Sequence, residues 1–132
     1  MAITQAIANS FKKELLDGAM SFKQTGGDTF KIALYISTAN LTSATSNYIT
    51  AGEVSNTGQY AAGGGALVNL GTSMTAGVAR CDFNDRSFTG VTLTARGALI
   101  YNTTAGSGSS TTDAVCILNF GADKTATSGT FT

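Results

Sequence analysis

The sequence predicts a mainly β protein, an antiparallel β-sandwich or jelly-roll-like domain with one amphipathic helix at the N-terminus. Short apolar runs separated by Gly, Ser, Thr and Asn recur along most of the chain, which is typical of strands joined by turns. Helical periodicity is confined to the first residues, and no strand–helix alternation follows it. The 132 residues fit one domain. We therefore expect a helix within residues 1–18, packed on the domain or on a partner, and a β-sandwich over residues 19–132.

The predicted sheet is organised around residues 91–120. Two apolar runs, at 98–101 and 114–118, are separated by a tract of Gly, Ser and Thr that can return the chain antiparallel. Both runs are almost continuously apolar, so we expect them at the centre of the sandwich. Gly97 interrupts the first run, which indicates a bulge or a bend.

The helix is predicted over residues 4–17. Apolar residues recur there every four positions: Ile3, Ile7, Phe11 and Leu15. Thr4 is the expected N-cap and Gly18 the expected C′ residue. The apolar stripe has two interpretations, which the sequence leaves open. It either covers the β domain or serves as a docking arm, and in the second case Ile7, Phe11 and Leu15 contact the partner.

Further strands are predicted in chain order along the rest of the sequence. They occupy residues 29–36, 66–70, 78–83 and 91–102, with Phe88 joining the sheet before the last of them. A turn is predicted at 72–77, and another starts at 84–85. In the first of them Phe30, Ile32, Leu34 and Ile36 alternate with more polar residues and are expected to face the core. Residues 121–128 read as a loop. Residues 129–132 read as the opening of a strand that either continues in the native chain or is completed by a neighbour.

Residues 37–65 are almost all small or polar, which is long for a connection without structure in a compact domain. They either contain short edge strands, around 48–50, or form a surface loop for partner contact. In the second case Tyr48 and Tyr60 are the expected anchors, because Tyr gives a large contact area at a low entropic cost.

The composition argues against several functions. Eight basic residues balance eight acidic ones, so the basic surface expected of a nucleic-acid-binding protein is missing. The chain has no His, and therefore lacks the commonest general base and metal ligand. Cys81 and Cys116 lie in apolar runs and are expected to be reduced core thiols. No apolar stretch is long enough to span a membrane, and the N-terminus lacks a signal-peptide pattern, so we expect a protein made in the cytoplasm.

Short motifs add no catalytic or cofactor site. The glycines at 63–65 and at 106–108 lack the Gly-Lys-Ser/Thr continuation of a phosphate-binding loop. The cluster of Asp82, Asn84 and Asp85 reads as a turn, since no calcium-binding loop closed by Glu surrounds it. We therefore predict that the protein is not an enzyme and uses neither a metal nor a cofactor.

Several stretches together resemble a family of small virion structural proteins of tailed bacteriophages. They are FKKELLDG at 11–18, DTFKIALY at 28–35, ITAGEVSNTGQYAAGGGAL at 49–67, TARGALIYN at 94–102 and AVCILNFGADKTATSGTF at 114–131. The family resembles head decoration, or cement, proteins. The resemblance implies a structural protein on the capsid exterior that binds the major capsid protein.

Two functional hypotheses follow. The first is a capsid decoration protein that bridges major capsid protein subunits and forms a homo-dimer or trimer. The second is a tail, fibre or adhesin domain that binds a host surface glycan, for which Tyr48, Tyr60 and Tyr101 are the candidate aromatic residues. The number of copies per particle separates them: hundreds for a cement protein, a few dozen or fewer for a fibre.

Overall fold

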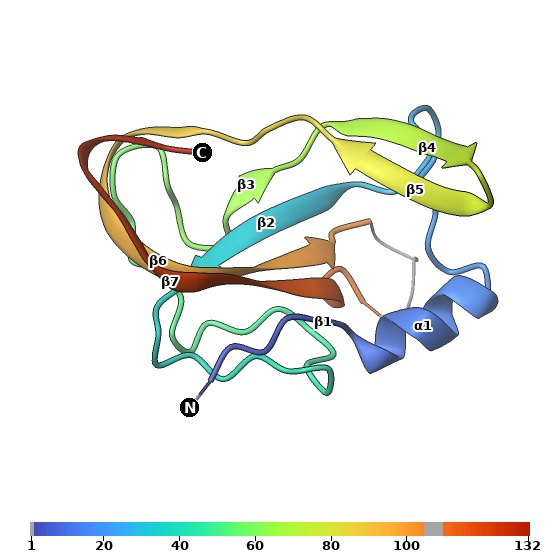
Figure 1. The fold of residues 1–132 in the computed structure, drawn as a ribbon, viewed down its shortest axis with the longest axis horizontal. Coiled ribbons are helices and arrows are strands. Elements are labelled where there is room, and N and C mark those ends of the chain that lie inside the picture. The colour runs from blue at the N-terminus through green and yellow to red at the C-terminus, as the bar shows by residue number, and fades with distance from the viewer. Residues whose placement is uncertain (1, 105–109) are drawn as a thin grey trace.

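The structure is a computed structural model that describes residues 2–104 and 110–132. It is mainly β, with antiparallel strands and one short helix near the N-terminus (Figure 1). The elements are β1 (Ala6–Ile7), α1 (Asn9–Leu16), β2 (Phe30–Tyr35), β3 (Gly65–Ala66), β4 (Asn69–Thr75), β5 (Val78–Phe83), β6 (Phe88–Asn102) and β7 (Asp113–Phe131). This confirms the predicted fold class.

Two sheets contain the described strands. The larger has five strands in the order β1-β7-β6-β2-β3, and β4 pairs only with β5. The predicted central hairpin is present, since β6 lies between β7 and β2. A sandwich-like packing fits this arrangement, and the jelly-roll alternative is not confirmed by the strand order.

The hairpin of β6 and β7 builds both layers of the molecule. The half next to the β6–β7 connection, residues 97–102 paired with 113–119, belongs to the five-stranded sheet. The half far from that connection, residues 88–95 paired with 124–131, pairs with no other described strand. It curls back over β2 (Figure 1). Register shifts occur along it, one of them between Ala95 and Gly97, where the sequence predicted a bulge.

Both faces of β2 are buried, in contrast to the predicted alternation. Leu34 packs in the cluster enclosed by the curled hairpin, together with Val91 and Ala126. Ala33 and Tyr35 pack on the opposite face against the residues that follow β2. Ile36 is exposed, because it lies past the end of the strand. The pattern of β2 is therefore that of a central strand with a cover on each side.

The N-terminal helix is shorter than predicted. Residues 3–7 are extended: the Thr4 amide donates to the Leu41 carbonyl at 2.8 Å, and Ala6 pairs with Ile117 of β7. The N-cap is Ala8, whose side chain cannot accept a hydrogen bond, so the predicted Thr4 cap is wrong. Strand pairing thus overrides the helical spacing of the first apolar residues. Gly18 has φ 73°, as expected of a C′ glycine.

Other boundaries also differ from the prediction. The 66–70 segment is divided between β3 and β4, and β4 continues to Thr75 through most of the predicted turn. Residues 121–128 belong to β7, because they pair with β6 along its curled half. Residues 48–50 form no strand, and the segment 37–60 covers the sheet with Leu41, Ile49 and Val54. The strand predicted at 78–83 is confirmed as β5.

Candidate functional site

Three of the predicted contact residues line one apolar groove between α1 and the β4–β5 hairpin. Ile7, Phe11 and Leu15 form one wall, and Ala79 and Cys81 of β5 form the other. Val115 and Cys116 of β7 lie between them. The groove has a volume of about 350 Å³, which is within the range of ligand pockets. It is the first candidate site.

The helical wall follows from the sequence. Phe11 and Leu15 are four residues apart, so they lie on the same side of α1. Phe11 turns inward and meets the Phe22 ring edge-on at 5.8 Å. Leu15 is 48% exposed, although it lines the groove. Leu16 is 90% exposed and is not among the groove residues. Two successive leucines of α1 therefore differ: Leu15 faces the groove and Leu16 faces solvent.

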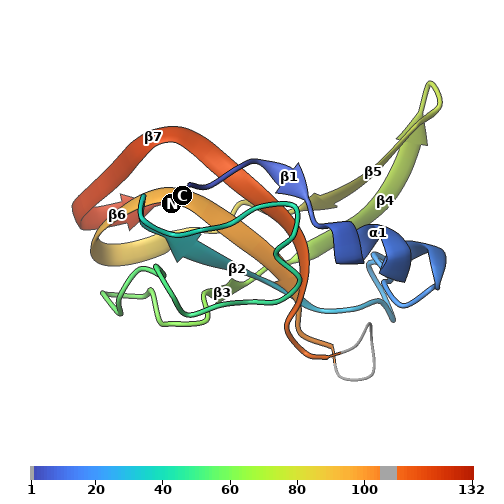
Figure 2. The ribbon, with the colours of Figure 1, turned by 90° about the horizontal axis from the view of Figure 1, so that it is seen from below.

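The strand wall could not be assigned from the sequence, because it depends on how the β4–β5 hairpin is placed. Thr72 pairs with Cys81 and Met74 with Ala79, and directly paired residues share a face of a two-stranded sheet. This face turns toward the groove with Cys81 and Ala79 and ends at Met74, which is 75% exposed. Figure 2 shows that the hairpin projects beyond α1 as an arm.

Both cysteines belong to this groove and both are free. Burial raises the pKa of the Cys116 thiol to about 11, with a smaller contribution from Cys81. Burial also raises the pKa of Cys81, although its residue surface is exposed. The prediction of free thiols is confirmed, but Cys81 is not a core residue, because β5 belongs to the projecting arm. Neither thiol has the lowered pKa of a catalytic nucleophile.

Tyr48 and Tyr60 do not reach the groove, and Tyr60 is not a surface anchor. Tyr60 is 1% exposed, and its hydroxyl donates to Glu53 Oε1 at 2.8 Å. The Tyr48 hydroxyl donates to Glu53 Oε2 at 2.5 Å, and its ring stacks on Tyr101 at 5.0 Å. The carboxylate of Glu53 therefore gathers these side chains inside the molecule, which corrects the predicted contact role of Tyr60.

Hydrogen bonds join Tyr48, Tyr60, Tyr101 and Glu53 into one group, the tyrosine cluster. The Gly63 amide also donates to Glu53 Oε1, at 2.7 Å, and the Tyr101 hydroxyl donates to the Gly63 carbonyl at 2.6 Å. Burial, and then the charge of Glu53, raise the pKa of Tyr101. Burial is also the main cause of the raised pKa of Tyr48 and Tyr60. These phenols stay protonated donors, so the cluster supports the fold.

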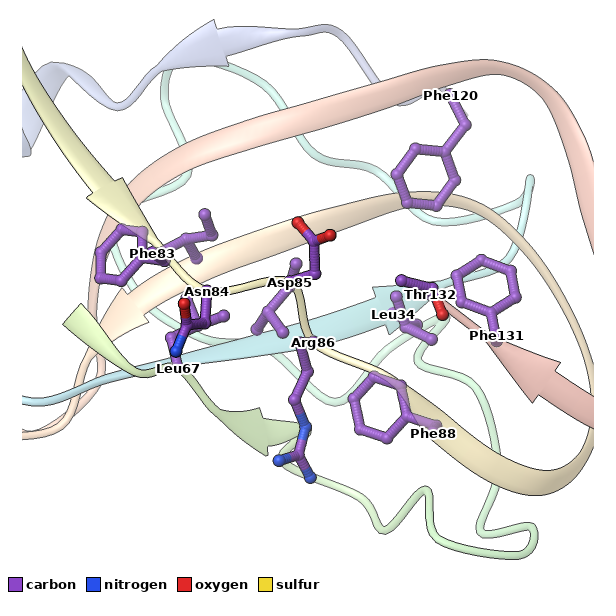
Figure 3. A pocket seen from close by; sticks show the side chains of 12 residues that line it. Leu34, Leu67, Phe83, Asn84, Asp85, Arg86, Phe88, Phe120, Phe131 and Thr132 are labelled. Carbon is purple, nitrogen blue, oxygen red and sulfur yellow. The ribbon is translucent and has the colours of Figure 1, made fainter. Parts of the chain in front are cut away.

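A second hollow was not predicted. It has a volume of about 330 Å³ and lies on the β2–β6 face of the larger sheet. Figure 3 shows the rings of Phe88, Phe120 and Phe131 on one side of it and Phe83 on the other. Its rim carries polar side chains from the β5–β6 connection: Asn84, Asp85 and Arg86. The aromatic residues come from three strands: Phe83 from β5, Phe88 from β6, and Phe120 and Phe131 from the two halves of β7. Only the fold brings them together.

Metal and membrane signals are lacking in the part of the chain that the structure describes. No group of three or more His, Cys, Asp and Glu side chains there is placed to hold a metal ion. Within residues 2–104 and 110–132, no helix has the length and apolarity needed to cross a membrane. The glycine tract at 106–108, which the sequence excluded as a phosphate loop, lies outside the described residues.

Comparison with protein-family models, curated proteins and solved structures finds no match. The functional proposal therefore depends on the sequence resemblance and on the surfaces of this chain.

Proposed function

We propose that the protein is a bacteriophage virion structural protein, a decoration or cement protein that binds the major capsid protein on the exterior of the head. In this role it is not an enzyme and needs no cofactor. The observation that carries the proposal is the apolar groove beside the projecting β4–β5 arm. Ile7 and Leu15 expose apolar surface in the groove, and Met74 exposes it on the arm, without a covering element in the described chain.

Exposed apolar surface of this kind marks interaction sites more often than isolated apolar residues do. The groove is concave and the arm is convex, so together they can clasp an edge or a loop of a lattice subunit. Each such contact can be weak, because many copies bind a repeating lattice and a linked set of weak contacts holds firmly. The zero net charge adds little repulsion between neighbouring copies.

The experiment compares two adjacent leucines of α1. Leu15→Asp places a charge in the groove, whereas Leu16→Asp places the same charge on the solvent side of the helix. Both proteins should fold, since α1 has no buried residue. Binding to undecorated phage heads is measured by co-sedimentation. We expect Leu15→Asp to weaken binding at least about tenfold, or about 1.4 kcal/mol, and Leu16→Asp to bind like the parent.

Equal binding of both variants would exclude the groove as the capsid contact. Failure of the parent protein to bind heads would exclude the decoration role.

The aromatic hollow favours a second candidate function, glycan binding by a tail, fibre or adhesin domain. Aromatic rings beside planar polar groups suit a sugar ring, and Phe120 and Phe131 line the same hollow as the rim residues Asn84 and Asp85 (Figure 3). Of the tyrosines first considered for this role, Tyr60 and Tyr101 are buried, and the hydroxyl of the partly buried Tyr48 is bound to Glu53. Binding of host-surface glycans that is lost in Phe120→Ala, and a low copy number per particle, would favour this function over cement.

A further inference from the structure

The two cysteines of the chain face a common space from different elements. Cys81 belongs to β5 of the projecting arm, and Cys116 belongs to β7 of the larger sheet. Both line the groove between the arm and α1. They are separated by thirty-five positions in the sequence, so their meeting is a product of the fold.

Packing at the base of the arm brings residues of both strands to one apolar cluster. Phe83 lies two residues beyond Cys81 on the same face of β5, and it packs in the cluster that includes Val115 and Cys116. The Phe83 ring also meets Phe30 edge-on at 5.6 Å. The charge of Cys81 contributes to the raised pKa of Cys116, as expected for neighbouring sulfur atoms.

Beyond this base the arm is held lightly. In the described chain β4 and β5 pair only with each other, and an isolated two-stranded hairpin is marginally stable in water. Asn69 Nδ2 donates to the Phe22 carbonyl at 3.1 Å, which ties the start of β4 to the body. The arm can therefore tilt toward β7 about its base, with Cys81 close to the pivot.

We propose that Cys81 and Cys116 are a disulfide pair whose oxidation fastens the arm to the sheet and closes the groove. The oxidant is a small-molecule disulfide such as oxidised glutathione. Cys81 is the exposed thiol and reacts first, and the half-buried Cys116 resolves the mixed disulfide. The inference does not depend on what the groove binds.

The reaction is thiol–disulfide exchange in two steps. Cys81 Sγ loses its proton and attacks one sulfur of oxidised glutathione, whose S–S bond breaks and releases one glutathione thiolate. Cys116 Sγ then loses its proton and attacks Cys81 Sγ, which forms the protein disulfide and releases the second glutathione. Two protein thiols are oxidised, one glutathione disulfide is reduced, and the two protons pass to the glutathione thiolates.

The reducing cytoplasm keeps such a pair as thiols, and an oxidising medium converts it. Of the charged residues near the two thiols, Arg80 contributes to the lining of the groove and Asp82 follows Cys81, whereas α1 and β1 present apolar Leu15, Phe11 and Ile7. With both thiols largely protonated, the exchange is slow at neutral pH and faster in mild alkali.

The experiment incubates the native full-length protein with oxidised glutathione at about pH 8.5, where more thiolate is present. We expect intact mass to fall by two hydrogen atoms, no free thiol to remain under denaturing conditions, and a single peptide pair linked through Cys81 and Cys116. Amide hydrogen exchange of residues 69–83 should slow at least about tenfold, because the disulfide removes the arm's freedom to open.

Single variants serve as controls. Cys116→Ser should stop at a stable glutathione adduct on Cys81, and Cys81→Ser should react far more slowly because Cys116 is half-buried. A stable adduct on Cys81 in the native protein, an intermolecular dimer, or no reaction while the denatured chain oxidises would each overturn the pairing. A disulfide that leaves the hydrogen exchange of residues 69–83 unchanged would overturn the closing of the arm.

Discussion

At the scale of single residues, Glu53 has the most consequential position in the fold. Its carboxylate accepts hydrogen bonds from Tyr48, Tyr60 and the Gly63 amide, at 2.5, 2.8 and 2.7 Å. These donors come from one long connection that the sequence marked only as small and polar. A carboxylate with three internal donors fixes the path of that connection, because a buried donor that loses its acceptor is costly.

We predict that Glu53→Gln lowers the free energy of unfolding by about 1–3 kcal/mol, because the new amide group turns a donor toward a site where all the partners are donors. Urea denaturation measures the change. Asp85→Asn is the matched control, since it neutralises an exposed carboxylate and should stay within about 0.5 kcal/mol of the parent. A Glu53→Gln protein as stable as this control would show that the cluster does not hold the connection.

The buried phenols predict how stability depends on alkaline pH. The pKa of Tyr35 and Tyr60 is raised above the ordinary value of 10.0, mainly by burial. The folded state therefore keeps protons that the unfolded state loses, so their contribution is complete below pH 10 and declines as the pH rises above it. Each of the two should remove about 1.4 kcal/mol of stability per pH unit in that range.

Absorbance of the phenolate during a pH titration tests this prediction, with circular dichroism recorded in parallel. We expect phenolate to appear only as the protein unfolds, in one steep transition. The raised pKa of Tyr48 and Tyr101 places all four tyrosines of the chain in the same transition. A phenol that titrates near pH 10 in the folded protein would contradict the buried cluster.

At the scale of elements, the sequence predicted strands best where apolar runs are short and bounded by turns. β5 and the β6–β7 hairpin were found in this way, as was the bulge at Gly97. The helix was predicted too long, because the four-residue spacing of Ile3 and Ile7 matches a helix whereas their backbone pairs with Leu41 and β7. The second half of β7 was missed, since its small polar residues pair through backbone groups that no side-chain pattern reveals.

The candidate site was predicted only in part, because local spacing in the sequence indicates one of its walls and not the other. Local spacing placed Phe11 and Leu15 on one side of the helix. The opposite wall, with Cys81 and Ala79, depends on where the β4–β5 arm lies. Tyr60 was misplaced because its partner Glu53 stands in a stretch without periodicity, where burial leaves no signal in the sequence.

The Gly97 bulge gives a prediction about the central hairpin. A Cβ at Gly97 would lie 2.5 Å from the Leu118 carbonyl oxygen and 2.8 Å from Ile3 Cγ2. Because the nearest atom is backbone of the paired strand, β7 must shift to accept a methyl group. We expect Gly97→Ala to lower the free energy of unfolding by about 1–3 kcal/mol, measured by urea denaturation.

Gly129→Ala is the matched control on the same hairpin. The nearest atom to its Cβ would be the Thr127 carbonyl oxygen at 3.5 Å, an ordinary contact. This variant should stay within about 0.5 kcal/mol of the parent. If Gly97→Ala is equally well tolerated, the close approach of β6 and β7 at the bulge does not constrain the strand pairing.

At the scale of the whole molecule, the surface combines neutrality with unevenly distributed apolar residues. Charged residues make up 12% of the chain, about half the usual share. Apart from Ile36, the exposed large apolar side chains of the described residues gather on or beside the arm and α1: Ile7, Leu15, Leu16, Val68, Leu70, Met74 and Val78. The opposite end, where β6 and β7 curl, turns its apolar residues inward around Leu34. One end of the molecule is thus suited to contact and the other to solvent.

This asymmetry leads us to expect a homo-oligomer, a dimer or trimer, in which copies meet through the arm. Met74 is 75% exposed and Val78 is 51% exposed on adjacent ends of β4 and β5, and no charged side chain separates them. Burying each against a neighbour contributes roughly 1.5–3 kcal/mol before the entropy of association is counted. Light scattering at micromolar concentration should therefore give two or three times the chain mass of 13.4 kDa.

Met74→Lys should shift the protein toward monomer, whereas Thr125→Lys on the exposed curl of β7 should not. A parent protein that is monomeric both free and on the particle would refute association, and an oligomer unaffected by Met74→Lys would place its interface away from the arm.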